Sequence, residues 1–158
     1  MIIIGFKNKK LSLEIVKKGQ KMKFEQSIDI SAKPETVFST YTNVSKWPEW
    51  DSELEAASID GDFIVGTFGK VKPKGDSECK IELTEVTQNR SFAMECRLPL
   101  CKMHFIHLMT PIESGTKVVN KVVFTGLLSP LFGRLIGKEI NKGLPDSLLG
   151  LKQHIEKS

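Results

Sequence analysis

The periodic pattern of apolar and polar residues begins near residue 22. The segment KFEQSIDIS alternates between the two kinds and is rich in β-forming residues, which predicts a strand. The next segment, AKPETVFSTYTNV, has Pro34 where a first helical turn tolerates it, and its apolar residues are spaced three and four apart, which predicts a helix. The segment NVSKWPEWD predicts a second, shorter helical stretch that is interrupted at Pro48.

From residue 52 to residue 126 the pattern changes to strands separated by turn residues. The gaps hold Asp-Gly-Asp, Lys-Gly-Asp, Gln-Asn-Arg and Ser-Gly, which are typical of tight hairpin turns. The predicted strands cover residues 53–59, 63–71, 77–87, 91–98, 102–112 and 116–126. With the first strand they make seven, and their sequential order predicts an antiparallel meander.

The chain ends in a long helical pattern. Ser129 is suited to the N-cap and Pro130 to the first helical position, whereas Pro145 predicts a kink because it removes a backbone donor. Apolar residues recur at helical spacing at Leu131, Leu135, Ile136, Ile140, Leu144, Leu148, Leu151 and Ile155. A sheet that is apolar on one face must bury that face, and this helix is the only predicted element long enough to cover seven strands. The sequence therefore predicts an α+β domain whose curved sheet grips one helix around an enclosed space.

Charge is distributed unevenly along this 158-residue chain, whose length and 40% hydrophobic content fit one globular domain. Residues 1–23 hold seven lysines and one glutamate, whereas the remainder holds 16 basic and 18 acidic residues. A nucleic-acid-binding domain usually carries a basic face on its body, so we predict no nucleic-acid partner. Residues 1–21 are predicted to form a weakly ordered basic arm, and residues 22–158 to form the domain.

The sequence predicts neither export nor integral membrane association. The apolar run in MIIIGFKNKK is too short for a signal-peptide core, and no stretch approaches the roughly 20 apolar residues needed to span a bilayer. Cys79, Cys96 and Cys101 form no CxxC pair and are odd in number, so we predict reduced, buried thiols in a cytoplasmic protein. No cofactor and no metal site are predicted, because no GxSxG, HExxH or phosphate-binding glycine loop is present.

Strand alternation predicts which side chains face the interior. In the strand 91–98 the inward set is Phe92, Met94, Cys96 and Leu98, while Glu95 and Arg97 take the other face. In the next two strands the inward set is Met103, Phe105, His107, Met109, Val118, Asn120, Val122 and Phe124. The enclosed space would be lined mostly by apolar side chains with two polar ones, which is the usual form of a small-molecule site.

The segment ISAKPETVFSTYTNVSKWPEWD and the tail FTGLLSPLFGRLIGKEINKGLPDSLLGLKQHIE carry a family resemblance. Over residues 22–156 the chain resembles the START-like (SRPBCC, helix-grip) superfamily, in its bacterial polyketide cyclase/dehydrase-like branch. The resemblance implies a seven-stranded helix-grip fold with an internal apolar cavity, closed at one end by two short helices. It also implies that Trp50 plugs the cavity against the sheet while Trp47 lies nearer its mouth.

His107 lies in FIHLMTP, which matches a motif of this branch. It is the candidate catalytic residue, since histidine titrates near neutral pH and can act as a general acid or base. The alternative is a buried imidazole that is hydrogen-bonded to Asn120 or to a backbone carbonyl. The branch often has a second histidine where Asn120 stands, so this departure weakens any mechanism that needs two titrating groups.

We predict that the protein binds a hydrophobic small molecule of lipid, polyketide or aromatic type, as a carrier without catalysis. The predicted ligand-binding residues are Trp47, Trp50, Phe68, Met94, Cys96, Leu98, Phe105, His107, Asn120, Phe124, Leu144 and Leu148. Two alternatives stay open: a cyclase- or dehydratase-type enzyme that uses His107, and a protein-interaction module. The predicted oligomeric state is a monomer or a weak dimer.

Overall fold

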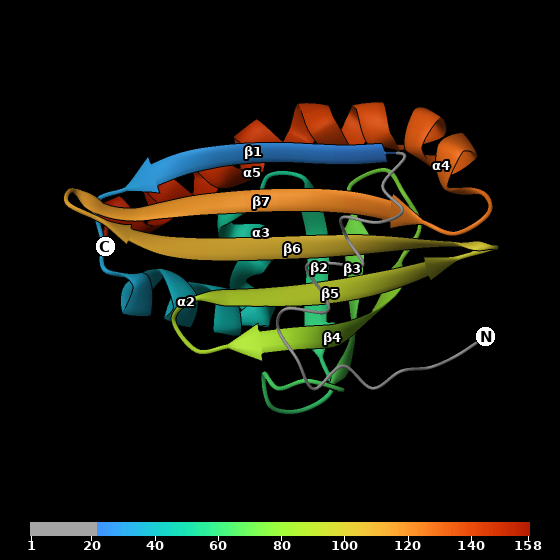
Figure 1. Ribbon diagram of the computed structural model, residues 1–158. Coiled ribbons are helices and arrows are strands. Elements are labelled where there is room, and N and C mark those ends of the chain that lie inside the picture. The colour runs from blue at the N-terminus through green and yellow to red at the C-terminus, as the bar shows by residue number, and fades with distance from the viewer. Residues whose placement is uncertain (1–21) are drawn as a thin grey trace.

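The computed structural model describes residues 22–158, so the predicted basic arm, residues 1–21, lies outside the described part of the chain. Seven antiparallel strands form one sheet in the order β1-β7-β6-β5-β4-β3-β2 (Figure 1). The strands are β1 (Met22–Ile30), β2 (Leu54–Ile59), β3 (Phe68–Pro73), β4 (Cys79–Thr87), β5 (Ser91–Leu98), β6 (Cys101–Ile112) and β7 (Gly115–Thr125). The predicted meander is therefore confirmed, and the first strand pairs with the last.

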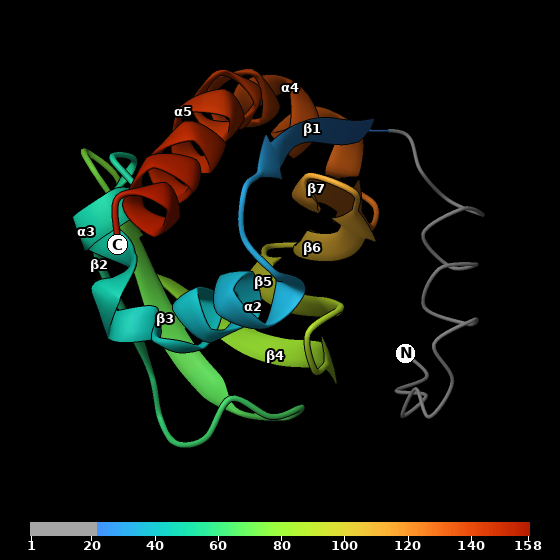
Figure 2. The same ribbon diagram turned by 90° about the vertical axis from the view of Figure 1, so that its left-hand side faces the viewer.

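The helices lie where the sequence predicts them. The short helices are α2 (Pro34–Thr42), the 3-10 turn η1 (Val44–Lys46) and α3 (Trp47–Trp50), and they are followed much later by α4 (Ser129–Leu135) and α5 (Gly137–Glu156). The sheet curls strongly, and α5 lies across its open side while α2 and α3 lie at one end (Figure 2). This arrangement confirms the α+β helix-grip prediction.

The interruption of the C-terminal helix lies at Ile136 instead of Pro145. Helical structure continues through Pro145, which is exposed on α5. At the observed break, Gly133 lies against Met22 and Gly137 against Phe24, so closely that a Cβ at either glycine would collide with the β1 side chain. The break between α4 and α5 thus coincides with close packing on β1, and the predicted kink at Pro145 stays a prediction.

Strand β3 begins at Phe68, five residues later than predicted. Residues 60–67 form a loop in which Gly66 has a φ of +91°, a conformation that favours glycine. The Gly66 N–H donates to the Leu83 carbonyl at 2.8 Å and holds the loop against β4. Ile64 and Val65 are exposed on this loop, whereas the prediction put both of them in a strand.

The concave face of the sheet carries the core, as strand alternation predicts. One row of paired residues crosses the sheet as Met94, Phe105, Val122 and Phe24. Glu95 takes the convex face, where its carboxylate lies 3.0 Å from the Lys102 ammonium group. The face assignments for β5, β6 and β7 are therefore confirmed.

Cys79 and Cys96 form a disulfide between β4 and β5, with their Cα atoms 6.4 Å apart. The prediction of reduced thiols is wrong for this pair, whereas Cys101 is free and buried. Strand register explains the pairing: Cys96 lies opposite Ile81, which places Cys79 diagonally across the ladder at a separation that a disulfide can span. Spacing along the chain alone carries no information about this register.

Candidate functional site

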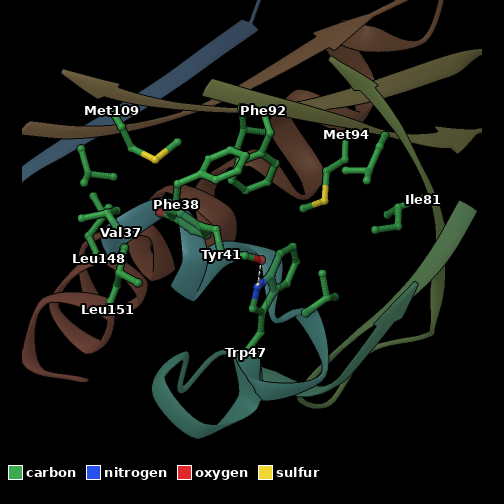
Figure 3. Packing of buried hydrophobic residues seen from close by; sticks show 14 of the residues in the cluster. Val37, Phe38, Tyr41, Trp47, Ile81, Phe92, Met94, Met109, Leu148 and Leu151 are labelled. Carbon is green, nitrogen blue, oxygen red and sulfur yellow. Dashed lines mark hydrogen bonds between the residues drawn. The ribbon is translucent and has the colours of Figure 1, made fainter. Parts of the chain in front are cut away.

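An aromatic cluster lies between the short helices and the concave face of the sheet, and we define it as Tyr41, Trp47, Trp50, Phe92 and His107. The buried face of α2 ends in Tyr41, one helical turn after Val37. The two tryptophans are three residues apart around Pro48 and point to the same side of α3. Figure 3 shows Tyr41, Trp47 and Phe92 converging from α2, α3 and β5.

Phe92 is the centre of the aromatic cluster and is fully buried. His107, its cross-strand partner on β6, stacks on it with ring centroids 4.1 Å apart and planes within 5°. Tyr41 meets Phe92 edge-on at 4.9 Å, and Trp47 lies 6.3 Å from the same ring. Phe63, from the loop before β3, adds a further edge contact at 5.1 Å. One ring thus joins both short helices, the 60–67 loop and the sheet.

Hydrogen bonds satisfy only part of the polar groups in the aromatic cluster. The Trp47 Nε1–H donates to the Tyr41 carbonyl at 2.9 Å, and the Tyr41 hydroxyl donates to Asn120 Oδ1 at 3.3 Å. Within the described chain, Trp50 Nε1 and His107 Nδ1 are buried and have no hydrogen-bond partner. Buried polar atoms normally find partners, so these two nitrogens are the feature of the interior that most needs explanation.

Both tryptophans are buried, so burial alone does not separate the plug and mouth positions predicted for them. Trp47 is only 3% exposed and reaches Phe92 on the sheet. Trp50 is 8% exposed and lines an open surface depression together with Lys46, Glu49 and His154. The C-terminal end of α3 packs against α5, where the Trp50 carbonyl lies against Gly150.

The two tryptophans provide a matched pair of stability measurements. Trp47→Phe is expected to lower the free energy of unfolding by about 1–2 kcal/mol more than Trp50→Phe. The first replacement breaks the bond to the Tyr41 carbonyl, whereas the second removes a buried N–H that has no partner. Urea unfolding of both variants measures the difference, and equal losses would mean that the Trp50 N–H is satisfied in solution.

His107 is enclosed by protein, and this burial lowers the pKa of its imidazole to about 3, although a hydrogen bond to the Phe92 backbone opposes the shift. The ring is therefore neutral at physiological pH. Part of the His107 surface is nevertheless accessible. A neutral imidazole at this position can donate or accept a hydrogen bond, but it does not carry a charge.

The other predicted site residues fall into three groups. Met94, Cys96 and Phe124 are buried on the concave face, and Leu148 and Asn120 are buried as well. The partly buried group consists of Leu98, Phe105 and Leu144. Phe68 is a correction: its side chain is 57% exposed and it pairs with Glu82 on the convex side, so alternation along β3 puts Gly69 and Val71 on the concave face instead.

Asp51, which directly follows α3, is partly buried. Its carboxylate accepts hydrogen bonds from the Ser147 hydroxyl at 2.8 Å and from the Glu53 N–H at 3.0 Å. Burial raises the pKa of this carboxyl, although both hydrogen bonds oppose the shift. Asp51 therefore ties the end of α3 to α5, a relation over almost a hundred residues that sequence patterns do not reveal.

Two open surface depressions lie on the described part of the chain. One is lined by polar side chains around Trp50 and His154, and the other by Arg90, Leu108 and Pro111 among others. From residue 22 onward, no group of three histidine, cysteine or acidic side chains is placed to hold a metal ion. The predicted internal cavity stays a prediction. The observation related to it is that His107 and Phe105, on the concave face, are only partly buried.

Comparison with known proteins identifies one matching family and many solved structures that share the same kind of fold. The family described as "Polyketide cyclase / dehydrase and lipid transport" matches residues 21–156. No curated protein sequence matches the chain. Among solved structures, protein MLL2253 from Mesorhizobium loti is 19% identical with a TM-score of 0.70, and the match covers 86% of this chain and 98% of that one.

Two other similar structures are an aromatase/cyclase and a synthase. The di-domain ARO/CYC StfQ from the steffimycin biosynthetic pathway is 14% identical with a TM-score of 0.70; the match covers 92% of this chain and 53% of that one. Norcoclaurine synthase from Thalictrum flavum, in complex with a transition-state analogue, is 13% identical with a TM-score of 0.67; the match covers 85% of this chain and 94% of that one. At such identities the likeness shows the fold.

Proposed function

The chain belongs to the polyketide cyclase / dehydrase and lipid transport family, and on this premise we propose that it binds a hydrophobic small molecule between the concave face of its sheet and helix α5. The ligand is of lipid, polyketide or aromatic type, and the protein acts as a binding or carrier module. The monomeric or weakly dimeric state, the cytoplasmic location and the lack of a nucleic-acid partner stay predictions.

The observation that carries this proposal is the incomplete burial of apolar side chains on the concave face. Phe105 stands in the middle of β6 between Met94 and Val122, which are both buried, yet Phe105 itself is only partly buried. Leu144, among the apolar residues of α5 that pack against the core, is also partly buried. Protein interiors are normally close-packed, so accessible surface at these positions favours space that an apolar ligand fills.

The two unpaired nitrogens are polar groups that a ligand would pair with only after neighbouring side chains move, because both atoms are buried. The Trp50 N–H would donate to a carbonyl or hydroxyl oxygen, and the His107 Nδ1 would accept from a hydroxyl or donate, depending on its tautomer. Because the pKa of His107 is about 3, the ring is a poor general acid or base near neutral pH. This favours the carrier over the enzyme alternative that relies on this histidine.

Filling the proposed space with a larger side chain is expected to abolish ligand binding. Leu144→Trp adds bulk on the partly buried side of α5, whereas Leu149→Trp adds the same bulk on its exposed side. Native mass spectrometry of protein purified from its own host would identify a bound ligand, and calorimetry with that ligand would compare the variants. We expect Leu144→Trp to weaken binding at least tenfold while Leu149→Trp binds like the wild type.

The control is thermal stability, because an overpacked core loses about 1–3 kcal/mol without losing its fold. If both variants melt cooperatively and bind alike, the ligand does not lie between the sheet and α5. If no apolar ligand accompanies the wild-type protein and none binds it, the carrier proposal is wrong.

A further inference from the structure

Four strongly exposed leucines gather at the end of the molecule where α4 lies. They are Leu100, Leu127, Leu131 and Leu135, each between 50% and 79% exposed, and we call them the leucine patch. They come from the β5–β6 turn, the β7–α4 loop and α4 itself (Figure 1). The Leu128 N–H donates to the Leu100 carbonyl at 3.0 Å, which holds the turn and the loop side by side.

The outward face of α4 alternates leucine with cation, and Lys138 continues this pattern in the first turn of α5, where the exposed Glu139 is paired with Lys142. The exposed residues of the pattern are Leu131, Arg134, Leu135 and Lys138. The last three lie three, four and seven residues after the first, which places all four along one stripe of the helical surface. The inward face is apolar too, with Gly133 against β1. Helices on the surface of a soluble domain normally turn polar residues outward, so the exposed leucines indicate an interaction surface.

Charge indicates what kind of partner this surface fits. The two segments that build it, residues 97–112 and 114–138, contain no aspartate or glutamate. Arg134 and Lys138 make no ion pair within residues 22–158. The surface therefore combines large aliphatic groups with unneutralised positive charge, a combination that suits an interface carrying both acyl chains and phosphates.

A second group of exposed aliphatic side chains lies beside acidic residues instead of basic ones. Ile64 and Val65 are 59% and 58% exposed, but Asp60 and Asp62 stand beside them in the loop. Anionic headgroups would repel this loop. The comparison shows that exposed aliphatic side chains alone do not define the leucine patch, and it provides an internal control.

The chain segment outside the described residues joins the fold at the same place. Met22, where β1 begins, lies against Gly133 of α4, so closely that a Cβ on the glycine would stand 2.5 Å from the Met22 Cγ. Residues 1–21 hold six lysines and one glutamate. The most basic part of the sequence is therefore attached beside the leucine patch.

We propose that the leucine patch docks the protein on the surface of an anionic lipid bilayer. The four leucines enter the boundary between headgroups and acyl chains, and Arg134 and Lys138 contact lipid phosphates. None of the helices between Met22 and Ser158 is long and apolar enough to cross a membrane, so the contact is peripheral. This inference concerns the outer surface and stands independently of a ligand inside the fold.

The test is co-sedimentation of the full chain with vesicles of phosphatidylglycerol and phosphatidylcholine, or of phosphatidylcholine alone. We expect binding to the mixed vesicles that weakens with salt, and much weaker binding to the neutral ones. The double variant Leu131→Ser, Leu135→Ser should bind both kinds roughly tenfold or more weakly, since apolar insertion is lost. The double variant Arg134→Gln, Lys138→Gln should lose roughly tenfold on the anionic vesicles alone.

The matched control is Ile64→Ser with Val65→Ser, which removes two equally exposed aliphatic side chains and should bind like the wild type. Melting temperatures of all variants verify that they are folded. The proposal is overturned if the wild type binds neither vesicle, or if the leucine variant binds as well as the wild type. It is also overturned if the wild type is a dimer that the leucine variant converts to a monomer without any vesicle binding, because the patch would then join two copies.

Discussion

Replacing His107 with glutamine is expected to make the folded protein markedly more resistant to acid. The imidazole has a pKa of about 3 in the folded chain, against an ordinary value of 6.5 that it regains on unfolding. Between about pH 3 and pH 6.5 the unfolded chain therefore binds a proton on His107 that the folded chain does not bind. Stability from this group is fully present above the unfolded pKa and is lost as the pH falls toward the folded one, by about 3 kcal/mol at pH 4 and at most about 4–5 kcal/mol.

The glutamine variant keeps a hydrogen-bonding side chain and cannot take up the proton. Denaturant unfolding at neutral pH and at pH 4 should thus show a smaller loss for His107→Gln than for the wild type. His154→Gln, on an exposed position of α5, is the control for a general effect of removing a histidine. Equal losses for wild type and His107→Gln would mean that the ring is solvated, and the inward assignment of β6 would fail.

The same variant separates the two leading functions. If the protein is a carrier, His107→Gln should bind the ligand within a few-fold of the wild type, because only one of several contacts changes. If it is an enzyme with His107 as acid or base, turnover should fall by about 100-fold or more.

Truncating Phe92 is expected to cause the largest loss of stability among core substitutions in the aromatic cluster. Phe92→Ala should cost about 3–5 kcal/mol, because the ring is fully buried and its neighbours cannot collapse into the space it leaves. Its contacts reach Tyr41, Trp47 and His107, which lie on three different elements. The melting temperature should fall by roughly 10 °C.

Phe68→Ala is the matched control for this measurement, since it removes the same side chain from a position that is 57% exposed. We expect the control to change the free energy of unfolding by no more than about 0.5 kcal/mol. Guanidinium unfolding compares the two variants directly. A Phe92→Ala loss as small as that of the control would show that the aromatic cluster does not join the short helices to the sheet.

Local sequence patterns predicted the fold, because strand alternation and turn residues can be recognised within short stretches of sequence. Alternation placed His107 and Asn120 on the concave face, and the register of β6 and β7 pairs them directly. The failures lie where distant segments meet. The Cys79–Cys96 disulfide depends on strand register, and the contact of Asp51 with Ser147 depends on how α3 meets α5.

The candidate site was predicted in part for the same reason. His107 was identified from its strand and motif, but Phe92 and Tyr41 were left out of the ligand set although both occupy inward positions that alternation and helical spacing reveal. Phe68 was included in the ligand set, but its pairing with Glu82 puts it on the convex face. Whether an interior side chain touches a ligand or only its neighbours depends on packing, which no local pattern contains.

The pairing of the first strand with the last sets the order in which the protein can fold. Met22 pairs with Phe124 and Ile30 with Thr116, so β1 has no partner until residues 115–125 have left the ribosome. The strands in between are sequential hairpins that can form earlier. Contacts between such distant residues slow folding, because a long loop must close before they contribute. During synthesis the edges of β1 and of the growing sheet stay open, and this interval is when the chain is most exposed to aggregation.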